Sequence, residues 1–100
     1  MSDVFDALAH PVRRKILKLL QKGPLSAGDL AASFDISKPT LSGHFAVLKA
    51  ADLVHTERQG TSIIYRLNMS VLEEAMAALM SIAGAEAPDP ANPISEGESS

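Results

Sequence analysis

The fold of this 100-residue chain is decided by residues 30–49, which read LAASFDISKPTLSGHFAVLK. Apolar residues recur there at helical spacing on two segments that are interrupted near Asp35, and they predict the inner faces of two crossed helices: Leu30, Phe34, Ile36, Leu41, Phe45 and Leu48. Ser26 and Ser37 are typical N-cap residues for these helices, and Pro39 suits the first turn of the second. Two helices separated by about three residues predict a helix-turn-helix.

Two more helices are expected ahead of this pair. The first covers residues 3–9, and the second runs from Pro11 to Lys22 and is stopped by Gly23 and Pro24. The third helix of the chain then starts after Ser26 and ends around Phe34.

Beyond residue 53 the apolar period changes to two. Residues 54–58 and 62–67 predict a β-hairpin that turns at Gly60. A capping box from Ser70 to Glu73 predicts the start of a last helix, which Gly84 closes. Four helices, a hairpin and a fifth helix give the order of a winged helix-turn-helix domain, mainly α with a small β-hairpin, over residues 1–84.

The net charge of -3 conceals a basic middle. Residues 85–100 hold four acids and no Lys or Arg, and their Pro, Ser and Gly content predicts a disordered acidic tail. Residues 10–67 hold all nine Lys and Arg against four acids, a formal +5. Such an excess is typical of a nucleic-acid binder, although a solvated charged face gives the same sum. We hypothesise that the tail reduces non-specific DNA binding, so that a truncation after Gly84 would raise affinity for random duplex.

The composition argues against several classes of protein. The chain has no Cys, which excludes disulfides, thiolate zinc sites and a Cys nucleophile. The longest apolar run, residues 75–80, is far shorter than the roughly 20 residues that span a bilayer. The first residues lack a secretory signal pattern, so we expect a cytoplasmic protein without a membrane partner. No hydrolase, phosphate-loop or zinc-protease motif is present, so neither an enzyme nor a cofactor is predicted.

The outer face of the second helix of the pair is the candidate binding site. Once its apolar residues turn inward, the outward side chains are those of Ser37, Lys38, Thr40, Ser42 and His44. Hydroxyl and cationic groups near a helix N-terminus suit base edges and phosphates in a major groove. An ordinary amphipathic helix is the alternative, but the neighbouring helix and hairpin favour double-stranded DNA as the partner.

Gly43 and the hairpin tip extend this candidate site. Glycine inside a helix costs about 1 kcal/mol relative to alanine. Gly43 therefore has three possible explanations: a close approach of the DNA backbone, tight packing, or neutral drift of the sequence. Residues 58–61 are Arg58, Gln59, Gly60 and Thr61. Arg58 is predicted to contact a phosphate or the minor groove, the alternative being an exposed charge that protects a strand edge.

No metal site is predicted. His10, His44 and His55 have no His or acid three or four residues away on the same helix, whereas a metal needs three or four converging ligands. His10 and His55 are instead predicted to be cap or surface residues.

The last helix is apolar over more than one stripe and therefore predicts a partner surface. Three methionines, Met69, Met76 and Met80, flank or occupy this helix. Their spacing is more typical of packing than of a ligand pocket.

Several segments together resemble the ArsR-type winged-helix repressors of bacteria. They are AHPVRRKILKLL (9–20), GPLS (23–26), ISKPTLSGHF (36–45), VLKAADLV (47–54), RQG (58–60) and YRLN (65–68). The resemblance covers roughly residues 3–83. Residues 36–42 together with 63–65 are most similar to the SdpR-like autorepressor branch.

The resemblance implies a homodimeric repressor that binds a palindromic operator. It implies that the first and last helices join the dimer, and on these helices we predict the interface residues Val4, Phe5, Leu8, Leu72, Ala75, Met76, Leu79, Met80 and Ala83. It places Ser37, Lys38, Thr40, Ser42 and His44 on DNA and Arg58 in the wing. With the neighbouring positions Gly43, Gln59, Gly60 and Thr61, these residues form the predicted DNA-binding set.

Metal and thiol sensing do not carry over from the resemblance. Metal-sensing members of the family have cysteines in the third helix, where this chain reads LSAGDL (25–30), or Asp/His sets on the last helix, which has no His here. No effector is identified. Two other functions stay open: a winged-helix module that binds another protein, and a small-molecule sensor with a pocket along the last helix.

Overall fold

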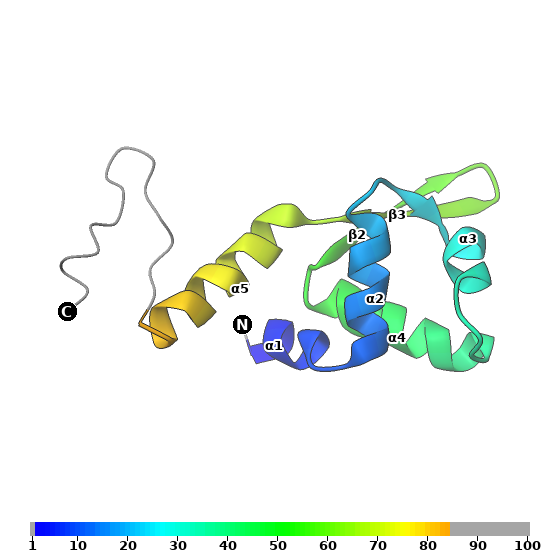
Figure 1. The fold of residues 1–100 in the computed structure, drawn as a ribbon. Helices are drawn as coiled ribbons and strands as arrows, with labels where there is room; N and C mark the ends of the chain where they lie inside the picture. The colour runs from blue at the N-terminus through cyan, green and yellow to red at the C-terminus, as the bar shows by residue number, and fades with distance from the viewer. Residues whose placement is uncertain (1, 85–100) are drawn as a thin grey trace.

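The computed structural model describes residues 2–84, so the predicted acidic tail and its role lie outside the described residues. The elements follow one another (Figure 1) as α1 (Ser2–Leu8), α2 (Pro11–Leu20), β1 (Leu25–Ser26), α3 (Ala27–Ala32), α4 (Lys38–Ala50), β2 (Val54–Gln59), β3 (Ser62–Leu67) and α5 (Met69–Ile82). The predicted winged helix-turn-helix order is confirmed, with one additional strand. Among the described helices, none has the length and apolar character that a bilayer crossing requires.

Side-chain caps set the starts of α2, α3 and α4. Ser26 Oγ and Ser37 Oγ each accept from the backbone N–H three residues on, at 3.0 and 3.4 Å, as predicted. His10 caps α2, because its Nδ1 accepts from the N–H of Val12 at 3.1 Å. Each cap satisfies an N–H that the first turn leaves without a helical partner, so local sequence fixes where α4 begins. The ends of α2 and α3 lie two residues earlier than predicted.

The wing is a three-stranded antiparallel sheet in the order β1-β3-β2. The predicted hairpin is confirmed, with β2 and β3 paired from Val54 opposite Leu67 to the turn, where Gly60 has φ 64°. The sequence does not predict β1, which pairs Leu25 with Tyr65. Two residues are too few to show an alternating pattern, so this strand exists through its tertiary pairing.

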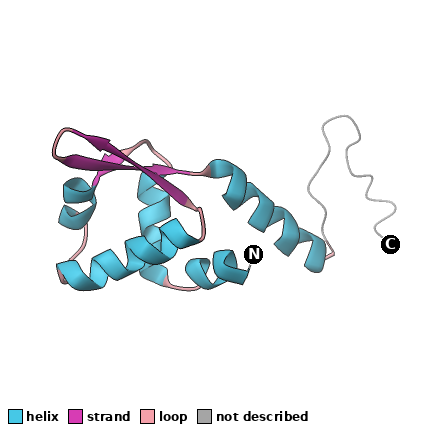
Figure 2. Ribbon diagram, turned by 180° about the vertical axis from the view of Figure 1, so that it is seen from behind, coloured by secondary structure: helices cyan, strands magenta, loops and turns pink. Residues whose placement is uncertain are grey.

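The core lies where α2, α3, α4 and the sheet meet (Figure 2). Its largest fully buried side chains are Ile16 of α2, Leu30 of α3, Leu48 of α4 and Leu53. Phe45 of α4 also packs on Tyr65 of β3, with ring centroids 4.6 Å apart. The inner face of α4 is therefore held by both the neighbouring helices and the wing.

The start of α5 departs from the sequence prediction. The expected capping box at Ser70 is wrong, because α5 begins at Met69 and its cap position, Asn68, makes no side-chain cap bond. Asn68 Nδ2 donates instead to the carbonyl oxygen of Asp52 at 2.9 Å, and its N–H donates to that of Leu53 at 2.9 Å. These tertiary bonds, which no local pattern encodes, fix the junction between β3 and α5.

Beyond that junction α5 projects from the body of the domain (Figures 1 and 2). Ala75 is its one buried residue. Most of this apolar helix is therefore exposed within a single described protomer.

Candidate nucleic-acid interface

The two faces of α4 differ sharply in burial. Leu41, Phe45 and Leu48 are buried against the core. The exposed residues include the predicted set Ser37, Lys38, Thr40, Ser42 and Gly43, whereas His44 is half-buried. The helix therefore offers a short polar surface near its N-terminus.

Two hydroxyls at the start of α4 form a local hydrogen-bond pair. Ser37 Oγ donates to Thr40 Oγ1 at 2.9 Å while it accepts the N–H of Thr40. Ser37 is thus engaged in the cap, whereas the Thr40 hydroxyl keeps its own proton to donate. Thr40 is the better placed of the two for a DNA contact.

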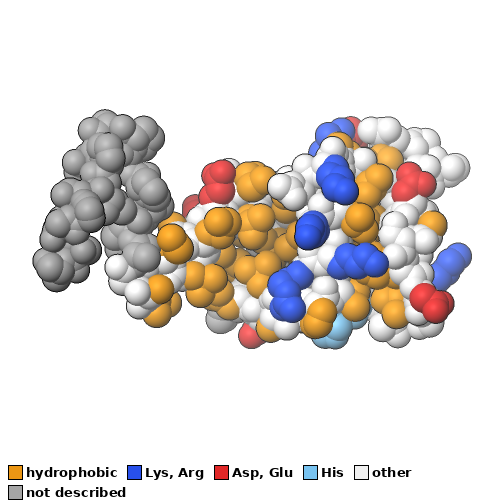
Figure 3. Space-filling view, viewed as in Figure 1, with side chains coloured by type: hydrophobic (Ala, Val, Ile, Leu, Met, Phe, Trp, Pro, Cys, Tyr) orange, Lys and Arg blue, Asp and Glu red, His pale blue; other side chains and the backbone are white. Residues whose placement is uncertain are grey.

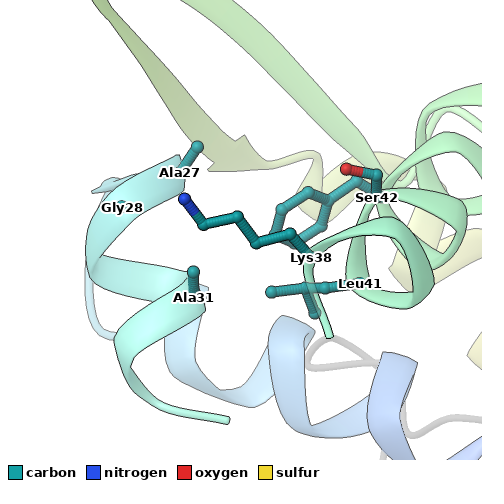
Figure 4. Close-up of a pocket in the computed structure, with 7 residues that line it drawn as sticks. Ala27, Gly28, Ala31, Lys38, Leu41 and Ser42 are labelled. Carbon is teal, nitrogen blue, oxygen red and sulfur yellow. The ribbon is translucent and has the colours of Figure 1, made fainter. Parts of the chain in front are cut away.

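Lys38 lies over a groove between α3 and α4. The groove has a volume of about 220 Å³ and is lined by Ala27, Gly28, Ala31, Lys38, Leu41, Ser42 and Phe45. Figure 4 shows the Lys38 side chain extending from α4 toward Ala27 and Gly28 at the start of α3. Small side chains on α3 leave this space open. The ammonium therefore lies at the edge of the helix pair, where a phosphate can approach.

His44 faces α2 rather than standing free on α4. Its Nδ1 is 3.1 Å from Nη1 of Arg13, and its ring centroid is 4.4 Å from that of His10. Partial burial, then the charges of His10 and Arg13, lower the pKa of His44 below its ordinary value of 6.5. His44 is therefore held toward its neutral form. Sequence reasoning missed the part of Arg13, because no local pattern joins residues 31 positions apart.

The wing tip carries one arginine that is free of ion pairs among residues 2–84. Residues 58–61 are all exposed. Arg66, on the neighbouring strand, donates from Nε to Oε1 of Glu57 at 3.1 Å, whereas Arg58 makes no such pair in that range. Arg58 stands on β2, an edge strand of the sheet, so a role in edge protection stays open beside a role in DNA binding.

Several cations of α2 are engaged within the domain. Figure 3 shows Lys and Arg side chains gathered over this helix. Arg14 Nη1 donates to the carbonyl oxygen of Leu8 at 2.8 Å. Lys15 Nζ donates to that of Ser33 at 3.3 Å and lies 4.8 Å from the ring centroid of Phe34. The basic excess of the sequence is therefore partly structural, and fewer cations are free to bind a partner than the sum suggests.

The predicted dimer residues divide into two groups. Val4 and Ala75 are buried within the protomer, and Phe5, Leu8 and Leu72 are partly buried. Met76, Leu79 and Met80 are exposed on α5, and Ala83 is exposed at its C-cap. Figure 3 shows the hydrophobic side chains that gather over α5 and beside it.

A groove of about 420 Å³ runs between α5 and the α1–α2 side of the body. Apolar side chains form most of its wall, including Leu8, Leu17, Leu67, Leu72 and Met76. Met69, Met76 and Met80, whose spacing predicts packing rather than a ligand pocket, are 43%, 56% and 39% exposed within the protomer, so a packing role for them requires a second surface. Sequence spacing cannot distinguish a core face from a face that awaits a second surface.

Within residues 2–84, no three His, Asp or Glu side chains come together as metal ligands would. His10 caps α2, and His55 is an exposed residue of β2. Both positions agree with the cap or surface roles predicted from the sequence.

Known proteins with related sequences are transcriptional regulators. A family model described as a helix-turn-helix domain matches residues 8–57. The chain is 46% identical to the transcriptional repressor SdpR of Bacillus subtilis (strain 168), over 76% of this chain and 84% of that protein. It is 40% identical to the arsenical resistance operon repressor of Staphylococcus xylosus, over 73% of this chain and 70% of that protein.

Solved structures with a similar fold are also transcriptional regulators. The crystal structure of an ArsR family transcriptional regulator matches with a TM-score of 0.77 and 28% identity, over 83% of this chain and 91% of that chain. Regulators of this kind are not enzymes.

Gly43 can be tested by adding the missing methyl group. A Cβ there would meet nothing within 4 Å, which makes the tight-packing interpretation wrong. We expect Gly43→Ala to raise the free energy of unfolding by about 1 kcal/mol in urea denaturation, because alanine is the better helix former. The exposed Ala46 of the same helix provides the control, since Ala46→Gly should cost a similar amount. A destabilised Gly43→Ala variant would contradict the open geometry.

The same variant separates the two remaining explanations of Gly43. If the stabilised variant loses DNA affinity, close approach of DNA is the reason for the glycine, whereas unchanged affinity would favour neutral drift of the sequence.

The depressed pKa of His44 predicts a pH-dependent stability. Because the folded-state pKa lies below 6.5, the unfolded chain takes up the proton first as pH falls. The stabilisation that neutral His44 contributes is fully present above pH 6.5 and is lost as the pH falls through the folded-state pKa. Below that pKa no further loss occurs. We expect the Tm, measured at one protein concentration, to fall over this window. His44→Asn should weaken the fall, whereas His55→Gln should leave it unchanged. Parallel profiles for wild type and His44→Asn would show that another group is responsible.

Proposed function

Because the chain belongs to the ArsR-type winged helix-turn-helix repressors, which bind DNA, we propose that it binds a palindromic operator as a homodimer. In this proposal α4 enters the major groove and the wing reaches the neighbouring backbone. The protein acts in the cytoplasm by occupying DNA, with no catalytic step and no cofactor.

The polar face of α4 is the observation that carries this proposal. The exposed residues near its N-terminus offer a hydroxyl donor at Thr40, a second hydroxyl at Ser42 and a cation at Lys38. The opposite face is fixed in the core by Leu41 and Leu48. A helix held rigidly from behind with small polar groups in front matches the requirements for reading base edges in a major groove.

The wing supplies the phosphate contact. Arg58 leads into the exposed tip at residues 59–61, which Gly60 turns with a positive φ. A cation at such a tip adds affinity for the backbone of any sequence, whereas Thr40 and Ser42 supply discrimination.

Dimerisation is supported by the exposed apolar face of α5. Leu72, Met76, Leu79, Met80 and Ala83 share one face at helical spacing, and the groove beside Met76 continues this surface toward α1. A second copy would cover the whole patch, with Val4 and Ala75 supporting it from inside each protomer. Two α4 helices in such a dimer would reach major grooves about 34–36 Å apart, which requires a near-palindromic site.

Two other roles predict different results in DNA-binding experiments. A protein-interaction module would enrich no duplex from a random library. A small-molecule sensor would keep the groove beside α5 open in the dimer and would release DNA when its effector binds. Because residues 36–42 and 63–65 resemble the autorepressor branch of this family, we further propose that the chain represses its own gene, which a duplex from the region upstream of that gene can test.

Arg58 gives a test of the wing. We expect Arg58→Ala to weaken binding about threefold to tenfold on cognate and random duplexes alike, and to reduce the slope of log K against log salt by about one. Lys22→Ala removes the same charge beyond the end of α2 and should change both quantities much less. Titrations at several salt concentrations give the slopes. A change in base preference without a change in slope would contradict the phosphate contact.

Leu79 gives a test of the dimer. This side chain is 49% exposed in the protomer, so Leu79→Glu should still fold, but in an interface its carboxylate would be buried without a partner. We expect sedimentation to show monomers at concentrations where the wild type is dimeric, and a palindromic duplex to lose its advantage over a half-site. Ser81→Glu places the same charge on the opposite side of α5 and should remain dimeric. A dimeric Leu79→Glu protein would place the interface elsewhere.

A further inference from the structure

Arg13 forms a three-way junction between α1, α2 and α4. Its Nε donates to the carbonyl oxygen of Ala7 at 2.8 Å, and its Nη2 donates to that of Asp6 at 2.9 Å. Its Nη1 lies 3.1 Å from Nδ1 of His44. The two carbonyls belong to the end of α1, so the guanidinium is already oriented when it meets the imidazole.

The chemistry of arginine fixes the state of His44. A guanidinium donates and never accepts, so Nδ1 of His44 must be the acceptor in this hydrogen bond. The imidazole is then neutral, with its proton on Nε2. Lysine at position 13 could not reproduce this geometry, because a single ammonium lacks the planar fork that reaches three acceptors.

The second ring nitrogen of His44 remains available to a ligand. Within residues 2–84 it makes no hydrogen bond, and no polar side-chain atom of that range is buried without a partner. Nε2 therefore reaches solvent and presents an N–H. The groups that face the ring are His10 and Arg13 from the start of α2, and the carbonyls of α1 lie behind Arg13.

The position of His44 on α4 indicates which DNA group this N–H meets. Helical spacing puts Gly43 near the outer pole of α4, opposite Leu41 and Phe45, whereas His44 lies on the flank that faces α2. A flank of a helix in the major groove lies at the groove's edge, where the phosphates are.

We propose that Arg13 is a positioning residue for DNA binding, which holds His44 so that its Nε2–H donates to a backbone phosphate at the edge of the major groove. This inference rests on the proposed entry of α4 into that groove. Arg13 makes no DNA contact itself and acts through His44.

The first test needs the wild-type protein alone. Long-range ¹H–¹⁵N NMR spectra distinguish the two imidazole tautomers, and His44→Asn identifies the His44 signals. We expect the Nε2–H form at neutral pH in the wild type and in Arg14→Lys, and a mixture of tautomers in Arg13→Lys. Both variants keep their charge, and Arg14 bonds a carbonyl of α1 without contacting His44. An Nδ1–H tautomer in the wild type would overturn the proposal without any variant.

The second test measures DNA binding with the duplex that the wild-type protein enriches most from a random library. We expect Arg13→Lys and His44→Ala each to lower affinity about threefold to tenfold on this duplex and on single-base mismatches of it alike. The double variant should be no weaker than His44→Ala, because Arg13 acts through that side chain. Arg14→Lys should bind as the wild type does. Additive losses, or a loss confined to one base pair, would refute the proposal.

Neutral methylphosphonates, placed one at a time in the same duplex, keep the test decisive if Arg13→Lys fails to fold. One position should weaken the wild type and have no effect on His44→Ala; the absence of any such position would refute the phosphate contact. If the wild type enriches no duplex at all, the proposed function fails. If it binds but the Arg13 and His44 variants match it, this inference alone fails.

Discussion

The burial of Leu30 and Leu48 in one core is the constraint on which the rest of the structure depends. Both side chains are fully buried, one on each helix of the helix-turn-helix. Because residues on a helix have fixed angular positions, choosing the buried face of α4 also chooses its outward face. The polar surface that we propose meets DNA is therefore determined by packing on the opposite side. Phe45 against Tyr65 extends the same constraint to the wing.

The sequence predicts those parts of the fold and site that arise from local patterns. Ser26 and Ser37 cap the helices they were expected to cap, and Gly60 turns the hairpin. What it does not predict depends on partners far along the chain. The strand at Leu25 needs β3, and the start of α5 follows from the bond between Asn68 and Asp52 rather than from a capping box.

Charge illustrates the same limit within the candidate site. A sum over residues counts Arg13, Arg14 and Lys15 equally with Lys38 and Arg58. In the folded domain Arg13 and Arg14 hold carbonyls of α1 and Lys15 holds the carbonyl at the end of α3, while Lys38 and Arg58 stand at the outer edges of the helix pair and the wing. Net charge indicates a class of partner, but only geometry separates binding charges from structural ones.

The exposed α5 makes the isolated protomer energetically incomplete. A helix of 14 residues is marginal in water by itself, and this one fully buries a single alanine while five of its large apolar side chains stay exposed, those of Met69, Met76, Leu79, Met80 and Ile82. A second copy that covered this face would stabilise α5 and restrain α1 beside it. Since Arg13 binds the carbonyls of Asp6 and Ala7 in α1 and also His44 in α4, such restraint would pass directly to α4, the helix that we propose reads DNA. In the proposed dimer, the first turn of α2 would therefore link assembly to DNA recognition.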